Sequence, residues 1–184
     1  LVKKVKSSAN VMQFITAKLS EKAYKSQQKA CEKALIIKDE AFKKIRDDIL
    51  LKGASDEYEI QQFICRRFTE EGMVYDEAPI VAIGPNASNP HYGPTSETHS
   101  PIKEGDLVLI DMWAKEDEEE GVYADITWMG YVGKAVPDVY KERFAIVKAA
   151  RDGVIAFLSE ELPKRKVYAY EADDVARRII TDRK

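Results

Sequence analysis

The stretch LVLIDMWAKEDEEEGVYADITW, residues 107–128, decides the fold because it is typical of two strands joined by a polar loop. Apolar and β-branched residues dominate both of its ends, whereas its middle is acidic and ends in a glycine. We predict strands over 107–114 and 122–132 that form an antiparallel hairpin. Asp111 and Asp125 interrupt these otherwise apolar runs, and their presence there requires a physical reason.

A hairpin loop centred on Glu118 would place Asp111 directly opposite Asp125. In that register both carboxylates lie on one face of the sheet, with Cβ atoms about 4.5–5.5 Å apart. They would repel, and neither arm of the hairpin contains a Lys or Arg to offset the repulsion. A bound divalent cation, or a pair of them, is the simplest species that keeps both ionised. The alternatives are a wet sheet edge, a basic partner from elsewhere in the chain, and a register shifted by one residue.

Helical spacing of apolar residues precedes the sheet. We expect a first helix capped by Ser8, a long helix between Ser20 and Gly53, and a third helix that begins at Ser55 and stops at Gly72. The apolar residues expected on the inward faces of the first and third helices are Val11, Phe14, Ile15 and Leu19, and Ile60, Phe63, Ile64 and Phe68.

A short β-prone run over 78–84 and a loop rich in Pro, Asn and Ser over 85–101 lead into the hairpin. After the hairpin we expect a helix from Val139 to about Leu162 and a last helix from near Tyr170 to the end of the sequence. The residues expected to face inward from the first of these two helices are Phe144, Val147, Val154, Phe157 and Leu158.

Composition narrows the class of protein. The 184 residues are 45% hydrophobic and 33% charged, which fits one globular domain with a helical extension. The net charge of −3 comes from interleaved acidic and basic residues, so we expect no nucleic-acid partner. No apolar run approaches the roughly 20 residues that span a bilayer, and the first residues lack the apolar core of a signal peptide. We therefore expect no membrane association, a cytoplasmic location, and free thiols at Cys31 and Cys65.

Three segments match a known family in order and spacing: IVAIGPNASNPHYGPT at 80–95, GDLVLIDMWAK at 105–115 and YADITW at 123–128. They resemble the first half of the creatinase/aminopeptidase, or pita-bread, metallopeptidases, and most closely the Xaa-Pro aminopeptidases and dipeptidases. SSANVMQF at 7–14 resembles the linker into the catalytic domain of these enzymes. YEADDVARRIITD at 170–182 resembles the helix before their later histidine motif.

The resemblance implies an α+β fold, the first half of a pita-bread fold, in which helices cover an antiparallel sheet. Residues 1–20 would form a linker helix from a missing N-terminal domain, and residues 21–184 the N-terminal half of the catalytic domain. The function implied is removal of an N-terminal residue from peptides with proline second, a bond without an N–H that ordinary peptidases resist.

The same resemblance implies roles for individual residues. Asp111 corresponds to the first aspartate ligand of a two-metal site, Asp125 to the second, which bridges the metals, and Thr127 to a hydroxyl beside them. His91 corresponds to the histidine that contacts substrate near the scissile bond, although by itself it is typical of an ordinary loop histidine. The cofactors would be two divalent ions, with Mn²⁺ expected and Co, Zn or Fe as alternatives. His99 has no counterpart and is expected on a surface loop.

The sequence departs from the family at three points. Trp113 stands where a small residue is usual, and Trp128 where an arginine is common. The third departure is that one histidine and two glutamates from the second half of the fold have no counterpart. The glutamates in the helices expected after the hairpin match none of these missing ligands, and we assign none of them to the metal site: Glu142, Glu160, Glu161 and Glu171.

We therefore expect a fragment that is inactive alone. Its missing half would come from a separate segment or from a second copy in a homo-oligomer.

Two other functions stay open. The pita-bread fold also occurs in non-catalytic protein-binding relatives, which have lost metal ligands, whereas Asp111, Asp125, Thr127 and His91 are all present here. Methionine aminopeptidases share the fold as well. The helical leader and the sequence around His91 favour the proline-specific branch.

Overall fold

The computed structural model describes residues 7–8, 11–12, 15 and 17–183. Phe14, expected in the helix from Ser8, lies outside the described residues, and the linker expected over 1–20 is described only in part. The inward face expected for this helix is wrong where it is described, because Val11, Ile15 and Leu19 are all exposed. The chain divides into two compact units, Leu1–Gly133 and Lys134–Lys184. None of the helices in the described part of the chain is long and apolar enough to cross a bilayer.

Helix α2, Glu21–Lys52, is the longest element, and both of its ends confirm the prediction. The Ser20 hydroxyl accepts a hydrogen bond from the backbone N–H of Ala23 at 3.0 Å. At the other end Gly53 adopts φ +80° and donates its N–H to the carbonyl of Ile49. A left-handed residue at this position favours glycine because it carries no Cβ.

Helix α3, Glu57–Glu70, begins two residues later than the expected start. The Asp56 carboxylate caps it by accepting the backbone N–H groups of Tyr58 and Glu59. The residues before the helix form strand β1, Ser55–Asp56, which pairs with β4, Pro101–Ile102. Neither two-residue strand is predicted by the sequence, because so short a segment contains no alternation.

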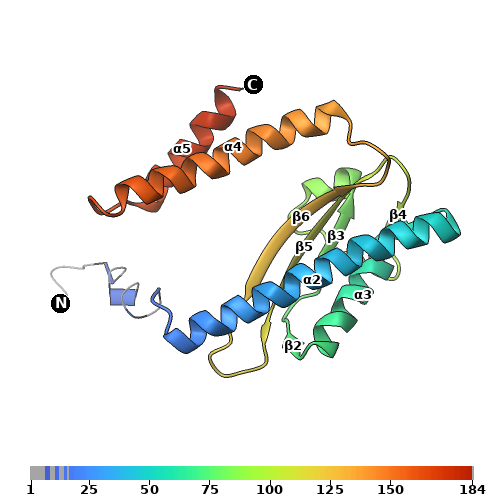
Figure 1. The fold of residues 1–184 in the computed structure, drawn as a ribbon, viewed down its shortest axis with the longest axis horizontal. Coiled ribbons are helices and arrows are strands. Elements are labelled where there is room, and N and C mark those ends of the chain that lie inside the picture. The colour runs from blue at the N-terminus through green and yellow to red at the C-terminus, as the bar shows by residue number, and fades with distance from the viewer. Residues whose placement is uncertain (1–6, 9–10, 13–14, 16, 184) are drawn as a thin grey trace, which may run out of the picture. The chain divides into compact units, whose positions relative to one another are not determined.

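Strand β5, Leu107–Glu116, lies at the centre of an antiparallel sheet (Figure 1). It pairs along one edge with β6, Ala124–Tyr131, and along the other with β3, Ile80–Ile83, and β2, Met73–Val74. The α+β class and the antiparallel hairpin are therefore as expected. A short 3₁₀ helix, η1, Gly84–Ser88, follows β3 and opens the loop toward residue 100.

One face of the sheet carries the hydrophobic core, and α2 and α3 both cover this face (Figure 1). Helix α2 approaches β6 closely at Gly130, where a Cβ atom would lie 2.5 Å from Cε1 of Phe42. The core residues contributed by β5 are Val108, Ile110, Met112 and Ala114, and those contributed by the helices include Ala34, Ile37, Ile45, Ile60, Ile64 and Phe68.

The second unit consists of α4, Asp138–Glu161, and α5, Ala169–Thr181, which pack against each other. Gly153 of α4 meets Ile179 of α5 so closely that a Cβ atom would clash. The inward face predicted for α4 is only partly correct, since Phe144 and Val147 are 59% and 61% exposed. Within this unit α5 has 13 residues against 24 in α4, so it covers only part of its length.

Candidate metal centre

The β5–β6 ladder places both aspartates on the sheet face opposite to the core. Asp111 pairs with Thr127, and Asp125 pairs with Trp113. The expected direct pairing of Asp111 with Asp125 is therefore wrong by two residues. An even shift keeps side chains on the same face, so the shared face is confirmed.

The shift has a local cause. Strand β5 continues past Ala114 because β2 pairs with Lys115 and Glu116. This extension moves the centre of the hairpin loop from Glu118 to the following residue. The two carboxylates are consequently diagonal neighbours across the ladder rather than direct partners.

Asp111 is half-buried in the middle of the sheet, between Ile80 of β3 and Thr127 of β6. The Thr127 hydroxyl donates a hydrogen bond to Oδ1 of Asp111 at 2.7 Å. Since Oδ1 carries this bond, the orientation of the carboxylate is fixed by its direct cross-strand partner.

Asp125 is more exposed than Asp111, but its carboxyl group is still partly removed from water. Its pKa is raised above the ordinary value, first by this partial burial and second by the negative charge of Asp111. Within the described residues neither aspartate forms an ion pair with a Lys, Arg or His side chain. The structure thus brings together two mutually repelling carboxylates without a basic partner.

A hollow of about 220 Å³ adjoins Asp111. Its strand side is lined by Ile80, Leu109 and Asp111, and its other side by the segment 86–90. His91 follows this segment directly. Its backbone N–H donates to Oδ1 of Asn89 at 3.0 Å, and the residue is exposed. The loop therefore lies beside Asp111, while the His91 side chain remains open to solvent and is not part of the hollow's lining.

His99 lies at the N-terminal end of α3. Its Nε2 atom is 2.9 Å from Oδ2 of Asp56, its Nδ1 atom is 2.8 Å from the carbonyl of Thr95, and its ring stacks on Tyr58. These contacts attach the end of the loop to α3. His99 lies on an exposed loop, as expected, and its side chain is 31% exposed despite these contacts.

The two tryptophans that depart from the family pattern lie on different faces of the sheet. Trp113 stands opposite Asp125 on the aspartate face, and its indole N–H donates to Oδ1 of Asp76 at 3.2 Å. Trp128 pairs with Ile110 on the core face, where the ammonium group of Lys38 lies 4.1 Å from its ring centroid. Only Trp113 borders the candidate metal centre.

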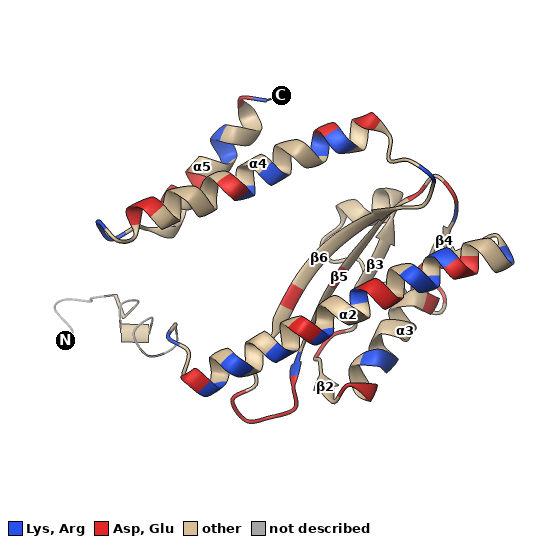
Figure 2. Cartoon of the chain, in the orientation of Figure 1, with Lys and Arg blue, Asp and Glu red and all other residues tan. Residues whose placement is uncertain are grey.

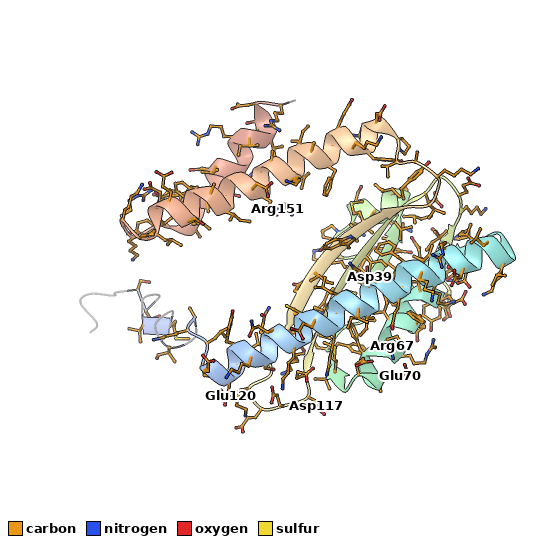
Figure 3. The ribbon with its side chains drawn as sticks, in the orientation of Figure 1. Asp39, Arg67, Glu70, Asp117, Glu120 and Arg151 are labelled. Atoms are coloured by element: carbon orange, nitrogen blue, oxygen red, sulfur yellow. The ribbon has the colours of Figure 1, made fainter. Side chains whose placement is uncertain are left out.

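The acidic run between the strands is a hairpin tip, as predicted. Figure 2 shows it as a continuous acidic segment, and Figure 3 places Asp117 and Glu120 on this loop near the start of α2. Glu120 accepts a hydrogen bond from Ser20 at 2.6 Å and pairs with Lys22 at 3.5 Å. Glu116 pairs with Lys33 at 2.7 Å. These partners make the run an attachment for α2.

The aspartate pair fits a divalent cation as part of a ligand set. Carboxylate oxygens are the donors that hard cations prefer, and the raised pKa of Asp125 marks a charge that a cation would neutralise. Among the described residues no cluster of three or more His, Cys, Asp or Glu side chains could hold a metal. Asp111 and Asp125 would therefore need further ligands.

Comparison with known proteins identifies the family and the fold. Metallopeptidase family M24 matches residues 28–184. The Xaa-Pro dipeptidase of Lactobacillus helveticus is 31% identical over 144 residues, covering 78% of this chain and 36% of that protein. The Xaa-Pro dipeptidase of Lactobacillus delbrueckii subsp. lactis is 34% identical over 103 residues, 56% of this chain and 25% of that protein. The chain thus spans about a third or less of the length of these relatives.

Solved structures show the same fold. Prolidase from Pyrococcus furiosus superposes with a TM-score of 0.72 at 23% identity, covering 96% of this chain and 48% of that one. Proline aminopeptidase P II from Yersinia pestis gives a TM-score of 0.67 at 25% identity, covering 89% of this chain and 34% of that one. The chain therefore belongs to metallopeptidase family M24, and its helices and antiparallel sheet form the first half of the pita-bread fold.

Proposed function

We propose that this chain forms one half of the active site of a metal-dependent peptidase that removes an N-terminal residue from peptides with proline second. The observation that carries the proposal is the pair of carboxylates, Asp111 and Asp125, which share one sheet face without a basic partner in the described residues. The named activities of the two Xaa-Pro dipeptidases direct the choice of substrate.

Each residue of the site has a proposed role. Asp111 and Asp125 hold two divalent ions, with Mn²⁺ first and Co, Zn or Fe as alternatives, because both offer hard oxygen donors. Such ions, when bound, would supply Lewis-acid chemistry, acidifying a water and stabilising negative charge on a peptide carbonyl oxygen. Thr127 holds Oδ1 of Asp111 in place. His91 lies beside the hollow and contacts the substrate.

The remaining ligands would come from another segment or from a second copy of the chain, since two carboxylates under-coordinate a divalent ion. A cytoplasmic location is also part of this proposal. Cys31 and Cys65 are both free thiols, which suits a reducing compartment.

The test compares Mn²⁺ binding and peptide hydrolysis in the full-length protein with its Asp111→Asn, Asp125→Asn and Asp117→Asn variants. Asp117 lies on the exposed hairpin tip and serves as the matched control. We expect the first two variants to lose Mn²⁺ binding and hydrolysis of an Xaa-Pro peptide, and the control to keep both.

A substrate panel separates the alternatives. Cleavage of a Met-Ala peptide but no Xaa-Pro peptide would indicate a methionine aminopeptidase. If the protein neither binds Mn²⁺ nor cleaves any peptide, the proposal is wrong and a non-catalytic binding domain is favoured.

A further inference from the structure

A carboxylate with no solvent exposure, that of Glu57, lies under the loop that borders the hollow. Glu57 is the first residue of α3, where a negative charge is favoured by the unsatisfied N–H groups of the helix terminus. Burial of a carboxylate is costly unless hydrogen-bond donors surround it. The donors around Glu57 all come from a single segment of the chain.

That segment runs from Ile83, the last residue of β3, through the loop to Ser100, just before β4. Oε2 of Glu57 accepts the hydroxyl of Tyr92 at 2.6 Å and the backbone N–H of Ser100 at 2.7 Å. Oε1 accepts the backbone N–H of Ile83 at 2.8 Å. The side-chain amide of Asn86 lies 3.2 and 3.3 Å from the two oxygens.

The four donors are distributed along the whole length of the loop. Ile83 and Ser100 lie at the two ends of the loop, and Asn86 and Tyr92 lie within it. One carboxylate therefore holds the loop at its entrance, at its exit and at two points between. Hydrogen bonds to a charged acceptor are stronger than neutral ones, so the four attachments act as one anchor.

The anchored loop is the one that borders the candidate metal centre. Asn86 itself lines the hollow, together with Asn89 and Asp111, and Tyr92 directly follows His91. None of the residues between 84 and 93 is fully buried, so burial in the core does not hold this wall in place.

We propose that Glu57 is a positioning residue that holds the loop 84–100, and His91 with it, beside Asp111. This inference rests on the proposed function and assigns a role to a residue outside the metal centre. Glu57 acts through the loop and does not touch the substrate. Burial and the Glu57 charge also raise the pKa of Tyr92, which keeps its hydroxyl protonated as a donor.

The first test is hydrogen exchange of the full-length protein carrying Glu57→Gln. Glutamine preserves the size of the side chain, but either orientation of its amide removes the acceptor from at least one of the two backbone N–H groups. We expect the amides of residues 84–100 to exchange about tenfold faster, while those of β5 remain unchanged.

The matched control is Asp48→Asn. Asp48 is also a buried carboxylate, but its hydrogen-bond partners are Lys44, Ser55 and Lys52, none of which lies in the loop. We expect this variant to leave exchange in the loop unchanged. Equal acceleration in both variants would mean general destabilisation and would overturn the proposal.

The second test is a double-mutant cycle with His91→Ala, read as kcat/KM for an Xaa-Pro peptide. If Glu57 acts by placing His91, Glu57→Gln reduces kcat/KM about tenfold in the wild type and by much less in the His91→Ala background. A purely structural role would give equal, additive losses and would contradict the proposal.

The outcomes of the two tests are independent of each other. Hydrogen exchange requires no catalysis, so it decides whether Glu57 holds the loop even if the protein proves to have no peptidase activity. If Glu57→Gln does not fold, Tyr92→Phe removes one donor from the loop side, and we expect smaller changes of the same kind. Unchanged loop exchange in a folded Glu57→Gln variant would refute the anchor.

Discussion

Thr127 and Asp111 are direct partners across β5 and β6, and the Thr127 hydroxyl lies 2.7 Å from Oδ1 of the aspartate. A threonine methyl and hydroxyl on a strand are held in few rotamers, so the hydroxyl is a fixed donor. The bond occupies only one of the two carboxylate oxygens of Asp111.

Thr127→Val should weaken Mn²⁺ binding about tenfold, because outer hydrogen bonds to ligands typically contribute this much to metal affinity. Valine has nearly the same shape and suits a strand, so the fold is retained. Thr127→Ser keeps the hydroxyl and should bind Mn²⁺ nearly as well as the wild type. Titration followed by electron paramagnetic resonance measures both affinities. Equal loss in the serine and valine variants would show that the hydroxyl is not responsible.

Asp125 should titrate above its ordinary range in the metal-free protein, and Asp111→Asn should lower its pKa, because burial and the Asp111 charge both raise it. Carbon-13 NMR of the carboxyl groups measures this pKa. Asp117→Asn, on the hairpin tip, should leave it unchanged. An Asp125 pKa that does not respond to Asp111→Asn would mean that the two charges do not interact.

The raised pKa of Asp125 also determines whether its contribution to stability grows or declines with pH. The folded protein binds the Asp125 proton more tightly than the unfolded chain, so this contribution to stability is present at low pH. It is lost as pH rises from the ordinary aspartate pKa through the folded value. Urea unfolding of metal-free wild type and Asp125→Asn at several pH values should show the decline only in the wild type.

Gly130→Ala should destabilise the protein by about 1–3 kcal/mol, since the new Cβ would overlap the Phe42 ring and force α2 or the ring to move. Gly93→Ala is the control, because a Cβ there meets no atom within 4 Å and its φ is not positive. Urea denaturation gives both free energies of unfolding. Similar values for the two variants would contradict the close approach of α2 to β6.

Ile110→Ala should cost about 2–5 kcal/mol, because Ile110 is completely buried between the sheet and the helices. Asp111→Asn, the next residue, should change stability by less than about 0.5 kcal/mol, since its side chain faces away from the core. An asparagine oxygen can still accept the Thr127 hydroxyl. Urea denaturation of both metal-free variants gives their free energies of unfolding. A large loss of stability in Asp111→Asn would contradict this prediction.

Much of the fold follows from local patterns. Ser20 and Gly53 delimit α2 correctly because each end is determined by a residue with a specific backbone role. The antiparallel strands are also correct, since two apolar, β-branched runs flank an acidic loop that ends in a glycine. The prediction that Asp111 and Asp125 share one face of the sheet depends only on the two-residue period of a strand.

Other features depend on contacts that no local pattern reveals. The hairpin register was wrong by two residues because β2, which extends β5, has only two residues and comes from far along the sequence. From the sequence, Glu57 is only a residue in the first turn of the helix expected from Ser55. A glutamate there is usual on an exposed surface, and nothing nearby in the sequence indicates that Ile83, Asn86, Tyr92 and Ser100 surround it.

The alternation along β5 has a consequence for how this protein can diverge. Residues 108, 110, 112 and 114 are buried in the core, whereas their neighbours at 111 and 113 lie on the opposite face, at the candidate metal centre. Substitutions at positions 111 and 113 can therefore arise in evolution, or in directed selection for a new metal preference, in a protein that has not first been stabilised by other mutations.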